Sequence, residues 1–222
     1  MKELKDKEVA FFGKITAGIT HEIKNVLAII KESSGLMEDI ISMSKDVSIP
    51  YQEKFQKTLS TIKDQVQRGV ELTGKLNRFA HSPDESPSET ELNEITDQLI
   101  ILSARFARLK NIILRNYPSE ERITIKTHPL KLQMVLFSCI ENCLNVMPLG
   151  GEIHIYPQKK EGKIAVHFSC EGDLPGKNDF FHNMKVSEKW SDLQQITDIL
   201  GGFAKFDESS HGISLFLPDE SH

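Results

Sequence analysis

One short segment of the sequence carries three residue types that together can do phosphoryl chemistry. In GITHEIKNVLAII, residues 18–30, His21 is followed directly by Glu22, and Asn25 stands one helical turn further on. A neutral imidazole is nucleophilic at one nitrogen when the other carries the proton, and a carboxylate that accepts a hydrogen bond from this N–H group fixes the tautomer. Asn25 can bind a phosphoryl oxygen or orient a water. We therefore expect catalytic roles for His21, Glu22 and Asn25; the alternative is an ordinary histidine on a solvated helix face.

Spacing along this segment also predicts a surface for a partner protein. Small and polar residues recur at steps of three and four from residue 14 to residue 32, so they share one helix face, with the histidine in the middle. Small side chains leave room for a second protein to approach. The residues expected to contact a partner are Lys14, Gly18, Ala28 and Glu32.

Two long amphipathic helices are expected to position this stripe. Apolar residues recur at steps of three and four over residues 8–44, and again over about residues 55–79, after Pro50 has blocked continuation of the first helix. The two helices should form an antiparallel hairpin. Because each has an apolar face wider than its one partner covers, a second copy should complete a four-helix bundle, and we expect a homodimer.

A polar segment, SPDESPSE at residues 82–89, divides the chain by composition. We expect a helical hairpin over residues 1–82, a linker over 83–90 and an α+β unit over 91–222. Hydrophobic patterning in the last part predicts helices at 92–110, 130–147 and 187–200. The strands are expected at 112–118, 123–129, 151–157, 163–169, 203–209 and 211–218.

Composition and charge argue against some kinds of binding partner and indicate a cellular compartment. The 222 residues include 39% hydrophobic residues and carry a net charge of −5, which argues against nucleic-acid binding because that function favours a basic surface. No apolar run approaches the roughly 20 residues that span a bilayer, so we expect no membrane insertion and a cytoplasmic protein. The cysteines Cys139, Cys143 and Cys170 are expected to be reduced core thiols, and no metal site is expected.

The first helix resembles a known family. FGKITAGITHEIKNVLAIIKESSGLMEDI, residues 12–40, is similar to the dimerisation and histidine-phosphotransfer helix of two-component sensor kinases, whose box reads H-E-x-x-N or H-E-x-x-T. The resemblance implies that His21 carries the phosphoryl group, that Glu22 is its base and that Asn25 supports dephosphorylation of the partner. One departure is Val26, where many members have a proline that kinks the helix.

The second half resembles the ATP-binding domain of the same kinases, a Bergerat-type α/β sandwich, but lacks several of its ligand-binding residues. Asn142 stands at the magnesium-binding asparagine of the box, and Ser138 replaces the earlier asparagine. In SCEGDLP we place Ser169 at the adenine-reading aspartate, with Glu171 and Asp173 where glycines belong. A serine cannot match a carboxylate as a charge-assisted acceptor, and two acidic side chains would repel a triphosphate.

The loop that wraps the phosphates in these kinases is also missing its glycines. None occurs between Gly176 and Gly201, although a phosphate cradle depends on backbone conformations that glycine adopts easily. We therefore expect a degenerate ATPase-like domain that binds no nucleotide, with Asn142 as a vestige of the site.

A phosphoacceptor helix joined to such a domain is similar to the ChpT-type histidine phosphotransferases. This resemblance implies a protein phosphorylated on His21 that relays phosphoryl groups between receiver domains of response regulators. It needs no cofactor, since the receiver domain supplies the magnesium ion. Two alternatives stay open: a sensor histidine kinase core with a divergent ATP site, and a non-catalytic pseudokinase scaffold.

Overall fold

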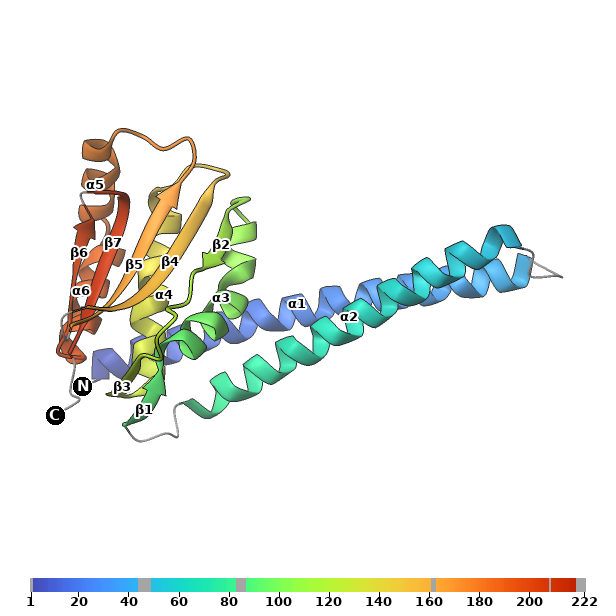
Figure 1. Ribbon diagram of the computed structural model, residues 1–222, viewed down its shortest axis with the longest axis horizontal. Helices are drawn as coiled ribbons and strands as arrows, with labels where there is room; N and C mark the ends of the chain where they lie inside the picture. Colours follow the sequence, from blue (N-terminus) through green and yellow to red (C-terminus); the bar gives the residue numbers. More distant parts are fainter. Residues whose placement is uncertain (1, 44–48, 83–86, 161–162, 208, 219–222) are drawn as a thin grey trace.

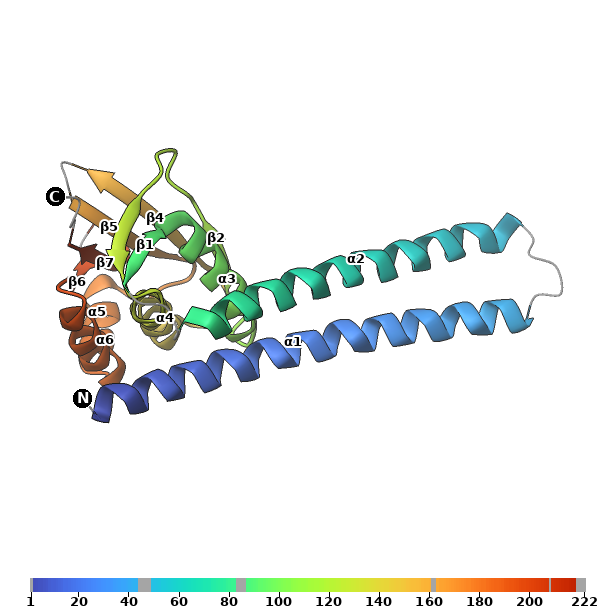
Figure 2. The same ribbon diagram turned by 90° about the horizontal axis from the view of Figure 1, so that it is seen from below.

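A computed structural model describes residues 2–43, 49–82, 87–160, 163–207 and 209–218. Two long helices, α1 (Lys2–Met43) and α2 (Ile49–His81), lie side by side and antiparallel, and they project from a mixed helix and sheet unit (Figures 1 and 2). Their period of apolar residues is that of amphipathic helices. The predicted hairpin is confirmed within one chain; the four-helix bundle and the homodimer stay predictions.

The second unit is an α+β sandwich, as the hydrophobic patterning predicts. Its five-stranded sheet has the order β2-β4-β5-β7-β6, in which only β2 and β4 run parallel. The strands are β2 (Ile113–Asn116), β4 (Glu152–Lys160), β5 (Lys163–Glu171), β6 (Phe203–Asp207) and β7 (His211–Leu217). A separate antiparallel pair joins β1 (Ser88–Glu91) to β3 (Thr124–Thr127).

Helices cover one face of the five-stranded sheet. They are α3 (Leu92–Arg108), α4 (Pro129–Val146), α5 (Lys177–Lys185) and α6 (Glu188–Ile199). The most buried is α4, which packs between the sheet and the other helices. Each strand presents every second residue to this core, as the pleat requires.

The hairpin and the α+β unit share one hydrophobic core. The ring of Phe11 on α1 lies 5.5 Å from that of Phe79 on α2 and 5.4 Å from that of Phe137 on α4. Phe106 on α3 packs edge-on against Phe137 at 5.5 Å. All four contribute to the same buried cluster or pack directly against it. The first turns of α1 are thus anchored in the α+β unit.

Two sequence expectations need correction. The predicted linker included residues 88–90, but these form most of β1. The SETE sequence of this strand is purely polar, so it does not indicate the pairing with β3. Residues 83–86 of the predicted linker lie outside the described part of the chain. Helix α5 was not predicted, because only Phe180 and Met184 of its nine residues are buried. Among the described residues, no helix has the length and apolar content to cross a bilayer.

Candidate functional site

His21 is exposed on α1, while its neighbours Ile19 and Val26 on the same helix are buried in the shared core. Its ring nitrogen Nδ1 lies 3.3 Å from the amide nitrogen Nδ2 of Asn25, one turn along the helix. An amide NH2 group can only donate, so this contact favours the tautomer of the neutral ring in which Nδ1 accepts and Nε2 carries the proton. Because its side chain is exposed, the histidine expected to accept a phosphoryl group is accessible to a partner.

Glu22 lies on another side of the helix and is buried, with only 5% of its surface exposed. Its carboxylate oxygen Oε2 accepts a hydrogen bond from Arg68 Nη2 on α2 at 3.2 Å and forms an ion pair with Arg108 on α3. The position of Glu22 next to His21 in the sequence predicts that this carboxylate orients the imidazole ring. That expectation is corrected for this structure, in which two arginines take up the carboxylate.

A cavity of about 360 Å³ opens beside these charged groups. It is bounded by all three of α1, α2 and α3, because Arg68 and Arg108 reach it from the second and third helices. Ala28 and Glu32, both expected to contact a partner, line it together with Asn25. These residues are exposed, as a partner surface requires.

Lys14 and Gly18 have a different place from the one expected. Lys14 pairs with Glu141 on α4, and its ammonium group lies 5.3 Å from the ring centre of Phe137. Gly18 is buried under Phe106, whose Cζ would lie 3.0 Å from a side-chain Cβ at this position. Both face the α+β unit of the same chain, so the predicted stripe is divided: its first part packs internally and only its second part is open.

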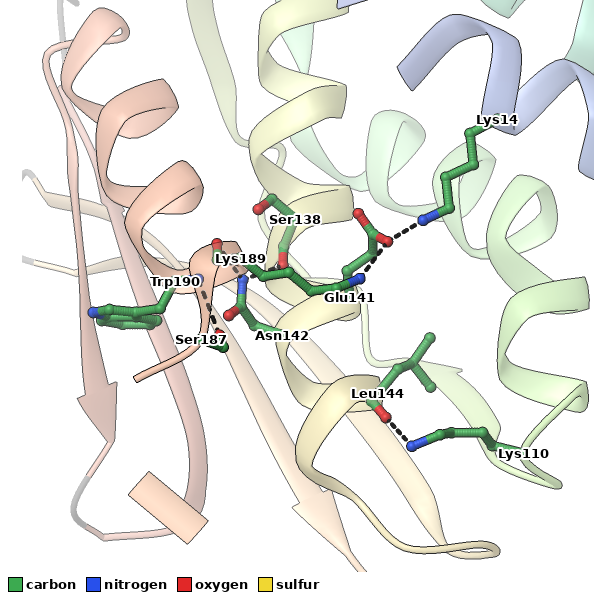
Figure 3. Close-up of polar contacts among 9 residues, drawn as sticks. All are labelled: Lys14, Lys110, Ser138, Glu141, Asn142, Leu144, Ser187, Lys189 and Trp190. Atoms are coloured by element: carbon green, nitrogen blue, oxygen red, sulfur yellow. Dashed lines mark hydrogen bonds and ion pairs between the residues drawn. The ribbon is translucent and has the colours of Figure 1, made fainter. Parts of the chain in front are cut away.

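The region of Asn142 shows how α4 and α6 meet (Figure 3). Asn142 is fully buried, and its Nδ2 donates to the carbonyl oxygens of Ser138 at 2.9 Å and Lys189 at 3.0 Å. Its Oδ1 is buried without a hydrogen-bond partner among the described residues. The side chain thus fastens the beginning of α6 to α4.

Charged and capping groups strengthen this junction. Glu141 accepts from Lys189 at 3.0 Å and from Lys14, so one carboxylate joins α1, α4 and α6 (Figure 3). Ser187 caps α6 by accepting from the backbone N–H of Trp190 at 3.2 Å. Because α5 ends at Lys185, only two residues separate it from α6. The segment directly before α6 is therefore a helix and a tight connection in place of a glycine loop.

The structure does not place Ser169 on the side of the sheet that the expected contact with adenine requires. On β5, Phe168 and Cys170 are buried in the core that α4 covers, so Ser169 between them points to the opposite face of the sheet. The residue that can face a ligand beside α4 is Cys170. A hydrogen bond with Cys143 and burial raise the pKa of the Cys170 thiol well above its ordinary value, so it is neutral at pH 7 and offers no carboxylate.

The turn after β5 also differs from the sequence assignment. Gly172 lies between the two acidic residues, with φ of +141°, and its neighbour across the turn, Gly151, has φ of +98°. A Cβ at Gly151 would lie 2.3 Å from the carbonyl oxygen of Glu171, so glycine is required there. One glycine of the motif is therefore present in this turn, although it serves backbone packing.

The residues at this position do not fit the magnesium ion and nucleotide of the kinase family. Magnesium needs several oxygen ligands at octahedral positions, and it keeps waters around it. The amide oxygen of Asn142 is buried, and the amide nitrogen of the same side chain donates to the backbone of α6 at Lys189. The nearest charged side chains include the ammonium groups of Lys14 and Lys189, which repel a divalent cation.

Sequence reasoning missed Arg68 and Arg108. Antiparallel pairing of the two long helices brings Gly69 within contact distance of Val26, which places Arg68 opposite the histidine segment. That pairing could have suggested Arg68. Arg108 comes from a separate unit of the fold, so no spacing in the sequence indicates its contact with Glu22.

No protein-family model matches the sequence. It is 25% identical over 176 residues to sporulation kinase A of Bacillus subtilis (strain 168), an alignment that covers 78% of this chain and 27% of that protein. The chain thus spans about a quarter of the length of this relative.

Among solved structures, the chain is similar to histidine kinase ThkA in complex with response regulator protein TrrA, at 18% identity, with 95% coverage of this chain, 63% of that chain and a TM-score of 0.46. A bacterial phosphotransferase structure is 12% identical, with 93% and 95% coverage and a TM-score of 0.47. These are proteins to which the chain is similar over most of its own length.

Proposed function

We propose that this protein is a histidine phosphotransferase that is phosphorylated on His21 and relays phosphoryl groups between receiver domains of response regulators without using ATP. The observation that carries the proposal is the junction around Asn142. There the only asparagine of the box is buried and bonded to the backbone of α6, at the place where a kinase holds its metal and nucleotide.

Exposure of His21 supports the acceptor role. A receiver domain that docks on α1 and α2 beside the open part of the stripe, near Ala28 and Glu32, would bring its phosphoaspartate in line with the imidazole. Phosphoryl transfer depends mainly on positioning and on neutralising charge, and the receiver's own magnesium supplies the second. This chain then needs no cofactor.

The hairpin supports an assembly of two copies. Leu59, Val66 and Val70 on α2 are about half exposed or more, and their spacing puts them on one face of the helix. A second hairpin on this face would complete the four-helix bundle and protect these side chains from water. The homodimer is therefore part of the proposal.

A histidine kinase core is the second candidate, and one observation favours it. Asn142 Oδ1 is buried without a partner among the described residues, and this is the atom that binds magnesium in the kinases that the chain resembles. The sequence relative named above is itself a kinase. For this candidate to hold, the start of α6 must move away from α4. A scaffold that carries no phosphate is the third candidate; in it His21 is only a docking residue, and Glu22 and Asn25 beside it have no chemical role.

One experiment separates the three candidates. The purified protein is offered γ-labelled ATP with magnesium in one reaction and a labelled phospho-receiver domain with magnesium in another. We expect label on the protein only in the second reaction and none in the His21→Ala variant. Label acquired from ATP on His21 would establish the kinase, and a protein that takes label from neither donor would be a scaffold. A control variant, His182→Ala on α5, should label as the wild type does.

A further inference from the structure

The ion cluster around Glu22 joins the α+β unit to the segment that carries the histidine. We call Arg68, Glu22 and Arg108 the arginine clamp. Both guanidinium groups meet the same oxygen, Glu22 Oε2, while the glutamate side chain is only 6% exposed and the arginine side chains are about half exposed. A buried carboxylate needs such partners, because leaving it unpaired away from water is costly.

In this arrangement His21 is not ready to attack. With Asn25 Nδ2 donating to Nδ1, the ring proton sits on Nε2, and a protonated nitrogen has no free lone pair. Attack through Nε2 requires the other tautomer, in which Nδ1–H donates to an acceptor. Glu22 is the adjacent carboxylate that can accept it, but the clamp holds that carboxylate elsewhere.

We propose that Arg108 is a positioning residue whose ion pair keeps the Glu22 carboxylate away from His21 in the free protein. When a receiver domain docks, its anionic acyl phosphate replaces Glu22 as the partner of Arg108. This inference rests on the proposed function. Paired guanidinium groups bind phosphate oxygens bidentately and strongly, so a phosphoaspartate competes well for them. The cavity of about 360 Å³ beside the clamp is lined by Arg68 and Arg108 and is open for that exchange.

The chemical step follows from the released carboxylate. Glu22 accepts a hydrogen bond from Nδ1–H of His21, and the lone pair on Nε2 forms the N–P bond. The bond between phosphorus and the aspartate oxygen breaks, and its electron pair leaves with the receiver's carboxylate. The Nδ1 proton stays on the ring, stabilised by Glu22, so the phosphorylated imidazole does not carry an unpaired positive charge.

Arg108 differs from Arg68 because it belongs to the other unit of the fold. It ends α3, next to the buried Ala107 and to Phe106, which packs on Gly18 of α1. Its reach to Glu22 therefore depends on how α3 is seated against α1. The clamp thereby makes the histidine respond to the α+β unit, which gives that unit a role that needs no nucleotide.

The first test reads the histidine tautomer and needs no receiver domain. Long-range ¹H–¹⁵N correlation spectra distinguish the two tautomers of the neutral His21 ring. We expect mainly the Nε2–H form in the wild type and a shift toward the Nδ1–H form in Arg108→Ala. The Arg108→Ala/Glu22→Gln double variant should return to the wild-type spectrum. Arg105→Ala, one turn earlier on α3 and without an ion pair among the described residues, is the matched control and should match the wild type.

Two spectral results would overturn the proposal. One is a wild-type tautomer ratio in Arg108→Ala, and the other is a shift that persists when Glu22 is replaced. Because Arg108 is half exposed, we expect these variants to fold, and Arg108→Lys, which keeps the charge, provides a second substitution that should stay close to the wild type.

The second test uses single-turnover transfer from a phospho-receiver domain. Arg108→Ala should raise the rate at saturating receiver, since Glu22 is released. It should also raise the half-saturating receiver concentration by about tenfold, the scale of one hydrogen bond to a charged group. If Arg108 had only a structural role, its loss would lower the rate at saturating receiver instead of raising it. That result would contradict the proposal. If no receiver labels His21 at all, the proposed function fails, while the tautomer spectra still decide whether the clamp holds Glu22.

Discussion

At the scale of single residues, Gly18 marks the closest approach between α1 and the α+β unit. A Cβ there would meet Phe106 Cζ at 3.0 Å, whereas a Cβ at Gly13, on the same helix, would meet nothing within 4 Å. Both glycines lie in a helix interior, where glycine costs about 1 kcal/mol relative to alanine. The packing thus gives a reason for one glycine and none for the other.

The two glycines form a matched pair for mutation. We expect Gly13→Ala to raise the free energy of unfolding by about 1 kcal/mol through helix propensity. Gly18→Leu should lower it by about 1–3 kcal/mol, because the larger side chain pushes Phe106 out of the shared core. Urea unfolding followed by circular dichroism measures both. A stabilised Gly18→Leu variant would mean that α1 does not pack on α3 in solution.

At the scale of elements, the periodic helices and the alternating strands were predictable, and the exceptions have physical causes. Strand β1 buries only Thr90 deeply, so its strand character comes from pairing with β3 and not from its own pattern. Alignment of β5 by motif placed Ser169 in the site, although the pleat turns it away. The histidine segment is helical, as its spacing predicts, but the pairing of Glu22 with Arg108 depends on α3, which sequence spacing cannot show.

A charged group at the sheet edge gives an element-scale prediction. Hydrogen bonds from Arg115 on β2 and then from His154 lower the pKa of Glu152 on β4 from 4.5 to about 2. A lowered carboxyl pKa stabilises the fold above the unfolded value, and this contribution is lost as the pH falls from about 4.5 toward 2. The pair ties the edge strand β2 to its neighbour, so acid should loosen that edge.

The measurement compares the wild type with Glu152→Gln. Their difference in melting temperature should be largest near neutral pH and should shrink as the pH is lowered from 5 to 2. Glu120→Gln, at an exposed loop position, is the control and should show little difference across that range. An NMR titration that finds Glu152 at its ordinary pKa would contradict the predicted pairing.

At the scale of the whole molecule, the shared core limits how the α+β unit can move. Phe11 and Phe79 from the hairpin pack with Phe137 from α4, so a rigid swing of the unit would expose aromatic surface from both parts. A kinase must carry its nucleotide to the histidine, and here that movement would also break the Lys14–Glu141 and Glu22–Arg108 pairs. In the proposed relay a receiver domain would approach His21 from outside, and only the Glu22–Arg108 pair would have to open.

The proposed homodimer is the remaining whole-molecule prediction, and its interface is the exposed apolar stripe on α2. Val66→Glu places a charge in the middle of that stripe, and two-fold symmetry repeats the change in both copies. Burying each unpaired charge costs at least about 2 kcal/mol, so the dimer dissociation constant should rise more than about 100-fold. Sedimentation equilibrium should find twice the chain mass for the wild type and a monomer for Val66→Glu. Leu149→Glu, at an exposed leucine outside the hairpin, should remain dimeric. A monomeric wild type, or a dimer that survives Val66→Glu, would rule out this face as the interface.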